Sequence, residues 1–381
     1  MELLIQQIDA LIVNATPRTN WLFVQVETVE GLRGYGEATL VGFEDLVLAG
    51  LALLAPRFTG QSAHEVERLC QLQPGLPGGL ALAAALSGIE QALWDIKGKA
   101  FNAPVYQLLG GACRPAVRLY ANINRSLRTD RSPAAFADHA RRAVSEGFTA
   151  VKCAPFDGLL RVPLEEPEGR RLYGEGLARV EAVRQAVGSD IDLMVDCHWR
   201  FDLRTALRVL PDLEALRLYW LEAPVSERDL DALAAVRAAT LARLAGGEHL
   251  SGVKAFQAYL EASQVDVVMP DVKYTGGLSG LRKVGALAEA AGSAVAPHNP
   301  SGPVASLASL HAAAAMPNAF ILEYAWGECD WRAELVGGGE RLHNGHMLLP
   351  EMPGLGVDFN HALAEAHPRQ PIVPMLDPRL W

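Results

Sequence analysis

The sequence predicts a closed α/β barrel preceded by a smaller α+β domain, and three observations lead to this prediction. The 381-residue chain is 50% hydrophobic and 20% charged, an ordinary globular composition with enough apolar residues for a large core. Residues 1 to about 40 alternate apolar and polar side chains, as antiparallel strands do. From about residue 118, short apolar runs alternate with helical stretches, as they do in parallel α/β structures.

The first 117 residues are predicted to form an α+β capping domain. The alternation is clearest in residues 21–28, WLFVQVET, and Glu30-Gly31 marks a turn before a second short strand over 32–37. Residues 44–110 are rich in alanine and leucine at helical spacing. Strands followed by helices in one short segment favour an α+β domain.

Eight apolar runs then recur with helical stretches, such as 133–146 and 176–187, between them. The runs are Val117–Asn122, Thr149–Ala154, Ile191–His198, Leu216–Ala223, Leu244–Leu250, Val265–Val272, Ala294–Asn299 and Phe320–Ala325. This alternation predicts a (β/α)7β barrel of the TIM type over residues 118–328. An open doubly wound sheet is the alternative, but no Gly-x-Gly-x-x-Gly motif follows an early strand. Residues 329–381 contain no further βα unit, so we expect them to return to the capping domain.

The composition limits the classes of binding partner and the cellular compartment that we expect for this protein. The formal charge is −10 and no basic stripe stands out, so a nucleic-acid partner is not expected. Five scattered cysteines without a Cys-x-x-Cys pair favour a reducing compartment. The start shows no signal-peptide pattern, and the longest charge-free stretch, residues 71–89, is interrupted by prolines and glycines, so no membrane span is expected. We therefore expect a cytoplasmic protein.

Titratable residues lie at the ends of six consecutive apolar runs. They are Asp196, Glu222, Glu248, Asp271, His298 and Glu323. By subtraction of residue numbers, neighbours in this series are 26, 26, 23, 27 and 25 residues apart, about one βα unit each. One acid at a strand end usually caps the next helix. Six at one depth instead indicate an active site at the carboxyl ends of the strands.

Three of these residues form a predicted metal site. Asp196, Glu222 and Glu248 would repel one another and raise each other's pKa. A hard divalent cation removes this cost, and oxygen-only ligands suit Mg²⁺ better than Zn²⁺. Mg²⁺ is therefore the predicted cofactor. For any one of the three acids, a salt bridge to lysine or arginine is the alternative.

The remaining strand-end residues are candidates for proton transfer and charge stabilisation. His298 would act as a general base, with its imidazole oriented by Asp271. The alternative is that His298 is a core histidine hydrogen-bonded to the backbone. Lys273 would share a face with Asp271 if the alternation continues, and would then weaken or redirect this pair. Glu323 has apolar and aromatic neighbours, which would raise its pKa and favour a neutral, hydrogen-donating form. Lys152 would bind a substrate carboxylate or pair with one of the acids.

The stretch VDCHWRF adds a second histidine. Residues two apart on a strand point to the same side, so His198 is predicted to share a face with Asp196. A carboxylate and an imidazole on one face of a buried strand indicate that this position belongs to a functional site.

Taken together, these features resemble the enolase superfamily, and in particular its mandelate racemase branch. The resemblance extends over nearly the whole chain. It rests on the phrase GLRGYGEATL, on the helix SGIEQALWDIKGKAFNAPVYQLLGG, and on the order of the barrel acids and histidine. It implies a metal-stabilised enediolate formed by a lysine or histidine base.

Two positions narrow the choice within this family. The stretch Lys152-Cys153-Ala154 lacks the second lysine of the Lys-x-Lys motif of two-base racemases. Asp271 stands five residues before Gly276-Gly277, where muconate-cycloisomerase-like members carry a base lysine. His298 is left as the base. The pair Asp196 and His198 is similar to that of galactonate-type acid-sugar dehydratases, in which this histidine protonates the departing hydroxyl; a partner of the metal site is the alternative.

The resemblance implies a dehydratase that removes the α-proton of a 2,3-dihydroxy carboxylate and eliminates the 3-hydroxyl to give a 2-keto-3-deoxy acid. Its partner would be a small-molecule sugar acid, and we expect a homo-oligomer. The segment TPRTNWLFVQVET resembles the strand and specificity loop of the cap in that group. Candidates for binding substrate hydroxyls are Arg18, Thr19, Asn20 and Trp21, with an ordinary surface loop as the alternative.

Three other functions stay open at this point. A racemase, epimerase or lactone cycloisomerase would use the same scaffold. A metal-dependent barrel hydrolase typically needs His-x-His on the first barrel strand, which here reads VRLYAN. A non-catalytic sugar-acid binder or a structural barrel would not need the full set of metal ligands.

Overall fold

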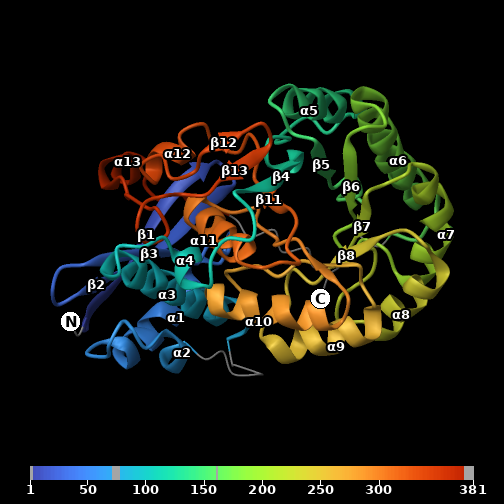
Figure 1. The fold of residues 1–381 in the computed structure, drawn as a ribbon. Coiled ribbons are helices and arrows are strands. Elements are labelled where there is room, and N and C mark those ends of the chain that lie inside the picture. The colour runs from blue at the N-terminus through green and yellow to red at the C-terminus, as the bar shows by residue number, and fades with distance from the viewer. Residues whose placement is uncertain (1–2, 71–77, 160–161, 373–381) are drawn as a thin grey trace.

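The predicted apolar runs form the eight strands of a closed parallel barrel (Figure 1). The structure is a computed structural model that describes residues 3–70, 78–159 and 162–372. The strands are β4 (Ala116–Asn122), β5 (Ala150–Cys153), β6 (Asp192–Asp196), β7 (Trp220–Glu222), β8 (Leu244–Gly246), β9 (Val267–Val268), β10 (Ala294–Val295) and β11 (Leu322–Tyr324). Neighbours pair in parallel from β4 to β10, and β11 pairs with β4. A parallel bridge between Val295 and Ala319 closes the ring, which confirms the predicted barrel.

An outer ring of helices covers the barrel (Figure 1). The helices are α5 (Pro133–Ser145), α6 (Pro167–Val187), α7 (Leu203–Ala215), α8 (Leu230–Ala239), α9 (Val253–Ser263), α10 (Gly277–Ala290) and α11 (Pro303–Ala314). Several begin at the residues that favour a helix start: the Ser132 hydroxyl accepts from Ala135 N, and Asp202 caps α7 in the same way. The helix predicted over 133–146 agrees with α5, whereas the one predicted over 176–187 is only the second half of α6.

The inside of the barrel is filled by side chains. Tyr120, Met194, Trp220 and Met269 form one buried cluster there, each with 0% exposure. The inside of the barrel is therefore a packed core, and polar groups can meet at the carboxyl ends of the strands.

The N-terminal part is a three-stranded antiparallel sheet packed on helices. The strands are β1 (Ile5–Thr16), β2 (Thr19–Thr28) and β3 (Arg33–Glu37), and the helices are α1 (Glu44–Phe58), α2 (Val66–Leu69), α3 (Gly79–Ala100) and α4 (Val105–Leu108). The alternating side chains of β2 enter two different cores: Leu22 and Val24 face the helices, while Trp21 and Phe23 join the core shared with the barrel. This strand is consequently buried on both faces.

Two buried glutamates join the cap to the barrel. Glu90 of α3 accepts hydrogen bonds from Leu278 N (2.8 Å) and Ser279 N (2.9 Å) at the start of α10. Glu37 of β3 accepts from Gly302 N and Ala305 N (both 2.8 Å) at the start of α11. Both carboxylates satisfy free N–H groups at a helix N-terminus, where negative charge is favourable. These contacts place the cap beside the loops that follow β9 and β10.

The C-terminal part adds a hairpin that no pattern in the sequence predicts. After α12 (Arg332–Leu335), strands β12 (Leu342–His343) and β13 (His346–Leu348) form this hairpin, and β13 pairs antiparallel with β4. The chain then returns to the cap, where Phe359 packs against Phe23 and Tyr35 before the short helix α13 (His361–Ala366). Residues 71–77 of the charge-free stretch and 373–381 of the C-terminal segment lie outside the described residues. In the part of the chain that is described, no helix is long and apolar enough to cross a membrane.

Candidate active site

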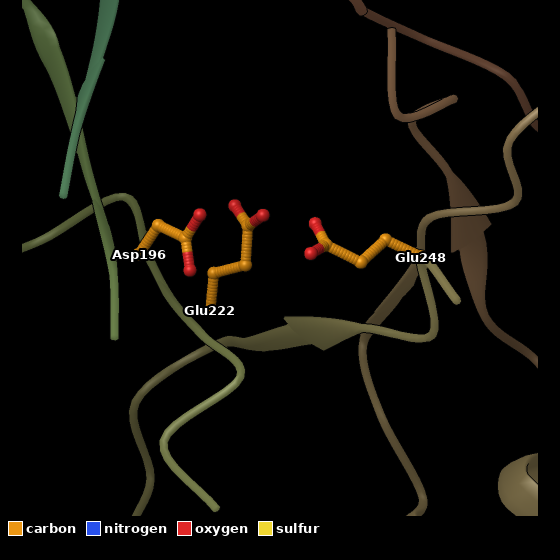
Figure 2. A group of neighbouring side chains, drawn as sticks. All are labelled: Asp196, Glu222 and Glu248. Carbon is orange, nitrogen blue, oxygen red and sulfur yellow. The ribbon is translucent and has the colours of Figure 1, made fainter. Parts of the chain in front are cut away.

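Three buried carboxylates converge at the carboxyl ends of neighbouring strands (Figure 2). Asp196 ends β6, Glu222 ends β7, and Glu248 follows β8 by two residues. The β6–β7 register sets Asp196 directly opposite Glu222, and Glu248 reaches toward them from the other side (Figure 2). One carboxylate oxygen from each lies within 4.8 Å of the others, and the exposed fractions are 2%, 0% and 5%. We call these three residues the acid cluster.

Lys152, from the middle of β5, neutralises part of the acid cluster. Its Nζ lies 2.8 Å from Glu222 Oε1, 2.9 Å from Glu323 Oε1 and 3.8 Å from Asp196 Oδ2. Burial lowers the pKa of Lys152, but these carboxylates raise it by more, so its pKa lies well above the ordinary value. Of the two roles considered for Lys152, the pairing with acids is the one observed; binding of a substrate carboxylate stays a prediction.

Within the acid cluster, the pKa values of Glu222 and Glu248 shift in opposite directions. Burial and the charge of Asp196 raise the pKa of Glu222 well above its usual range, as expected. Burial also raises the pKa of Glu248, but His298 and His249 lower it by more, and the net pKa is well below the usual range. The expectation of a raised pKa was therefore wrong for Glu248, because the neighbouring imidazoles offset the repulsion.

The donor atoms of the acid cluster fit a hard divalent cation. All are carboxylate oxygens, the ligands that Mg²⁺ prefers. Among the described residues, Glu248 Oε2 is buried and has no hydrogen-bond donor in acceptable geometry, although His298 Nε2 lies 3.2 Å away. A buried oxygen left in this state is available as a metal ligand. Asp196, Glu222 and Glu248 could thus hold a metal ion together.

His298 and Asp271 form a buried pair beside the acid cluster. A parallel bridge joins the two residues after β9 and β10, and His298 Nδ1 lies 2.8 Å from Asp271 Oδ2. Burial raises the pKa of Asp271, but Lys273 and His298 lower it by more, so this carboxyl is ionised. An ionised carboxylate only accepts hydrogen bonds, so Nδ1 carries a proton, and Nε2 is the ring nitrogen turned toward the acid cluster. That Nε2 faces Glu248 at 3.2 Å.

Lys273 shares the Asp271 carboxylate with His298. Its Nζ lies 2.6 Å from Asp271 Oδ2, the same oxygen that His298 contacts, and also donates to the Ser301 hydroxyl. Its backbone N–H donates to Asp271 Oδ1 at 2.7 Å. Lys273 lies in the turn after β9, not in the strand, but the contact that the alternation suggested is present.

The prediction of a neutral, hydrogen-donating Glu323 was wrong. Its carboxylate accepts from Asn122 Nδ2 (2.7 Å) and Asn299 N (2.9 Å), and Lys152 adds a positive charge at 2.9 Å. Burial raises the pKa of Glu323, but Lys152 and His298 lower it by more, so the net pKa is lowered. The aromatic neighbours in the sequence indicated burial correctly, but they could not show that a lysine from β5 meets this side chain.

His198 reaches the site by a different route from the one predicted. Strand β6 ends at Asp196, and His198 has a φ of +45°, in the left-handed region, so strand alternation does not apply. Its backbone N–H instead donates to Asp196 Oδ1 at 2.8 Å, and its Nε2 lies 2.7 Å from Asp196 Oδ2. On the other side, Nδ1 lies 2.6 Å from Oδ1 of Asp157, which is not among the residues predicted for the site.

The cap residues proposed to bind substrate occupy two kinds of position. Arg18 is exposed in the β1–β2 turn, and Thr19 contacts Arg125 of the short helix η1 (Ile123–Arg125) that follows β4. Asn20 is buried and donates to the backbone oxygen of Gln370 at 2.8 Å. Trp21 is also buried, with its ring edge-on to Trp331 at 5.5 Å. Substrate binding by these residues stays a prediction.

Comparisons with known proteins agree with this architecture. Residues 135–363 match the family model described as enolase C-terminal domain-like, and residues 10–110 match that of the mandelate racemase/muconate lactonizing enzyme N-terminal domain. The structure aligns with that of a mandelate racemase/muconate lactonizing enzyme-like protein from Rubrobacter xylanophilus, with a TM-score of 0.88 and 31% identity over 97% of this chain and 98% of that one.

Curated relatives share about a third of the sequence. A D-xylonate dehydratase from Haloferax volcanii is 34% identical over 91% of this chain and 85% of that protein. A D-gluconate dehydratase from Thermoproteus tenax is 33% identical over 94% and 72%, and a D-galactonate dehydratase from Verminephrobacter eiseniae is 35% identical over 90% of both chains. All three names describe hydro-lyases. The chain therefore belongs to the mandelate racemase/muconate lactonizing enzyme family of the enolase superfamily.

Proposed function

We propose that this protein is a Mg²⁺-dependent sugar-acid dehydratase. It would remove the α-proton of a 2,3-dihydroxy carboxylate and eliminate the 3-hydroxyl, giving a 2-keto-3-deoxy acid. The observation that carries the proposal is the position of two imidazoles at opposite ends of the acid cluster. His298 Nε2 lies 3.2 Å from Glu248, and His198 Nε2 lies 2.7 Å from Asp196. An elimination needs one group to take a proton and a second to give one, and this arrangement supplies both.

His298 is the proposed base. Its Nδ1 proton is held by Asp271, so that Nε2 accepts the α-proton on the side of Glu248. His198 is the proposed acid, because a proton on its Nε2 would reach a leaving hydroxyl on the side of Asp196. Because the α-proton of a carboxylate is very weakly acidic, the negative charge that develops must be strongly stabilised.

The acid cluster would hold the Mg²⁺ ion. When bound, this ion would supply Lewis-acid charge next to the developing anion. Lys152 lies within 4 Å of Asp196, Glu222 and Glu323, and its ammonium group would bond a substrate carboxylate oxygen. Glu323, in its ionised form, would hold Lys152 in place, and would not itself donate a hydrogen bond.

A racemase, epimerase or lactone cycloisomerase is the second candidate, since two proton-transfer groups on opposite sides of a substrate also suit inversion at one carbon. Two points favour dehydration. The single Lys152 lacks the second lysine of the two-base racemases, and the three relatives described above carry dehydratase names.

The test is a screen of aldonic and aldaric acids with Mg²⁺, beginning with D-xylonate, D-gluconate and D-galactonate and detecting keto-acid formation. We expect at least one acid to be dehydrated, and the activity to disappear with EDTA. Exchange of the α-proton with solvent, without loss of the 3-hydroxyl, would instead assign a racemase or epimerase. Binding without either reaction would assign a sugar-acid binder.

A further inference from the structure

Asp157 lies in the loop that follows β5, next to His198. Its Oδ1 is 2.6 Å from His198 Nδ1, and its Oδ2 is 3.3 Å from Arg131 Nη2. Arg200 adds a second positive charge, with its Nη2 3.8 Å from Asp157 Oδ1. Asp157 is 41 residues from His198 in sequence, and the fold alone brings them together.

This pair repeats the geometry of the pair on the opposite side of the site. In both, a carboxylate lies within 2.8 Å of Nδ1, and Nε2 points toward the acid cluster. Because an ionised carboxylate only accepts hydrogen bonds, the Asp157 contact keeps a proton on His198 Nδ1. The ring orientation that presents Nε2 to the site is therefore fixed by Asp157, as Asp271 fixes that of His298.

The contact with Asp157 matters more for His198 than a similar contact would for a fully buried residue. Its side chain is 35% exposed, and its backbone and that of Trp199 are both in the left-handed region, with φ of +45° and +56°. A histidine ring that is free to turn would exchange the positions of its two nitrogens, and here the contact of Nδ1 with Asp157, together with that of Nε2 with Asp196 at 2.7 Å, decides which nitrogen faces the site.

Asp157 is itself held by Arg131, and Arg131 is in turn held by Arg179. Arg131 Nη2 also donates to Ala154 O at 2.7 Å, so it ties the Asp157 carboxylate to the end of the β5 segment. Arg179 of α6 donates to Arg131 O and to Pro155 O, both at 2.7 Å. The carboxylate therefore has a defined position, against which the imidazole can be oriented.

We infer that Asp157 is a positioning residue for the acid step, holding His198 so that Nε2 faces the leaving hydroxyl. This inference rests on the proposed dehydratase function, and it assigns Asp157 no contact with substrate. The competing reading is that Asp157 only ties two surface loops together. The two readings differ in which proton-transfer step suffers when the carboxylate is removed.

The experiment compares two rates in the Mg²⁺-loaded enzyme in D₂O, with an acid that the wild type dehydrates. Keto-acid formation reports the complete reaction, and deuterium at C2 of recovered substrate, measured by NMR, reports removal of the α-proton without elimination. We expect Asp157→Asn to slow dehydration by about 100-fold or more. The ratio of exchange to dehydration should rise by at least tenfold, because His298 still works. Asp190→Asn, an exposed aspartate before the start of β6, is the matched control and should leave both rates unchanged.

Two results would overturn the inference. A dehydration rate within about threefold of the wild type would show that Asp157 is dispensable, and a fall in both rates at an unchanged ratio would show a structural role only. The double variant Asp157→Asn with His198→Asn should show the ratio of His198→Asn alone, since Asp157 acts through that ring. If the wild type dehydrates no acid in the screen, the proposed function fails, and that result appears before any variant is made.

Discussion

Replacing Lys152 by methionine should destabilise the metal-free protein strongly. Lys152 is 1% exposed and lies within 3 Å of both Glu222 and Glu323, each 0% exposed. Removing one partner of a buried ion pair leaves an uncompensated charge, at a cost of about 3–5 kcal/mol. The free energy of unfolding measured by urea titration with EDTA should therefore fall by about that amount in Lys152→Met.

The matched control is Lys283→Met. Lys283 pairs with Glu67 on the surface, where the two side chains are 49% and 58% exposed, and the loss should stay within about 1 kcal/mol. Adding Mg²⁺ should recover more stability in Lys152→Met than in the wild type, because the ion replaces the missing charge next to Glu222. Unfolding free energies in EDTA that agree within about 1 kcal/mol between Lys152→Met and the wild type would refute the assignment of Lys152 as the charge that balances these buried acids.

Two further predictions concern the base and the pH dependence of stability. His298→Asn should slow both α-proton exchange and dehydration by about 100-fold or more, measured by NMR in D₂O; exchange at the wild-type rate would exclude His298 as the base. Burial raises the pKa of Glu90 to about 7, so its ionisation costs more in the folded than in the unfolded protein, and this cost grows as pH rises from about 4.5 to 7. The wild type should therefore lose about 3 kcal/mol relative to Glu90→Gln between pH 4.5 and 8, and a constant difference in urea titrations would contradict this.

The barrel could be predicted because its strands have a strong local signal. The strands are short, mostly buried apolar runs, and in six consecutive runs, from 191–198 to 320–325, a titratable residue lies at or near the carboxyl end. The β12–β13 hairpin has no such signal, since Leu342 and His343 are exposed and only β13 contacts β4. Its position depends on the start of β4, residues 116–118, which extends before the residues that pair with β5 and β11, and this is a property of the assembled fold.

The candidate site was predictable where its residues follow strands at regular spacing. It was less predictable where a loop, or a side chain distant in sequence, determines the position or the ionisation state of a residue. Asp196, Glu222 and Glu248 come together as the spacing indicated. Asp157 gave no signal, because it lies three residues beyond the end of its apolar run and meets His198 only through two loops. The ionised state of Glu323 depends on Lys152, 171 residues earlier by subtraction, and no local pattern reports such a contact.

The most direct test of the central claim is a crystal structure of the protein grown with Mn²⁺, a close substitute for Mg²⁺ with measurable anomalous scattering. We predict a single strong anomalous peak within about 2.0–2.4 Å of one oxygen each from Asp196, Glu222 and Glu248. Three carboxylates without a peak between them at millimolar Mn²⁺, or with Lys152 in the position of the ion, would contradict the account.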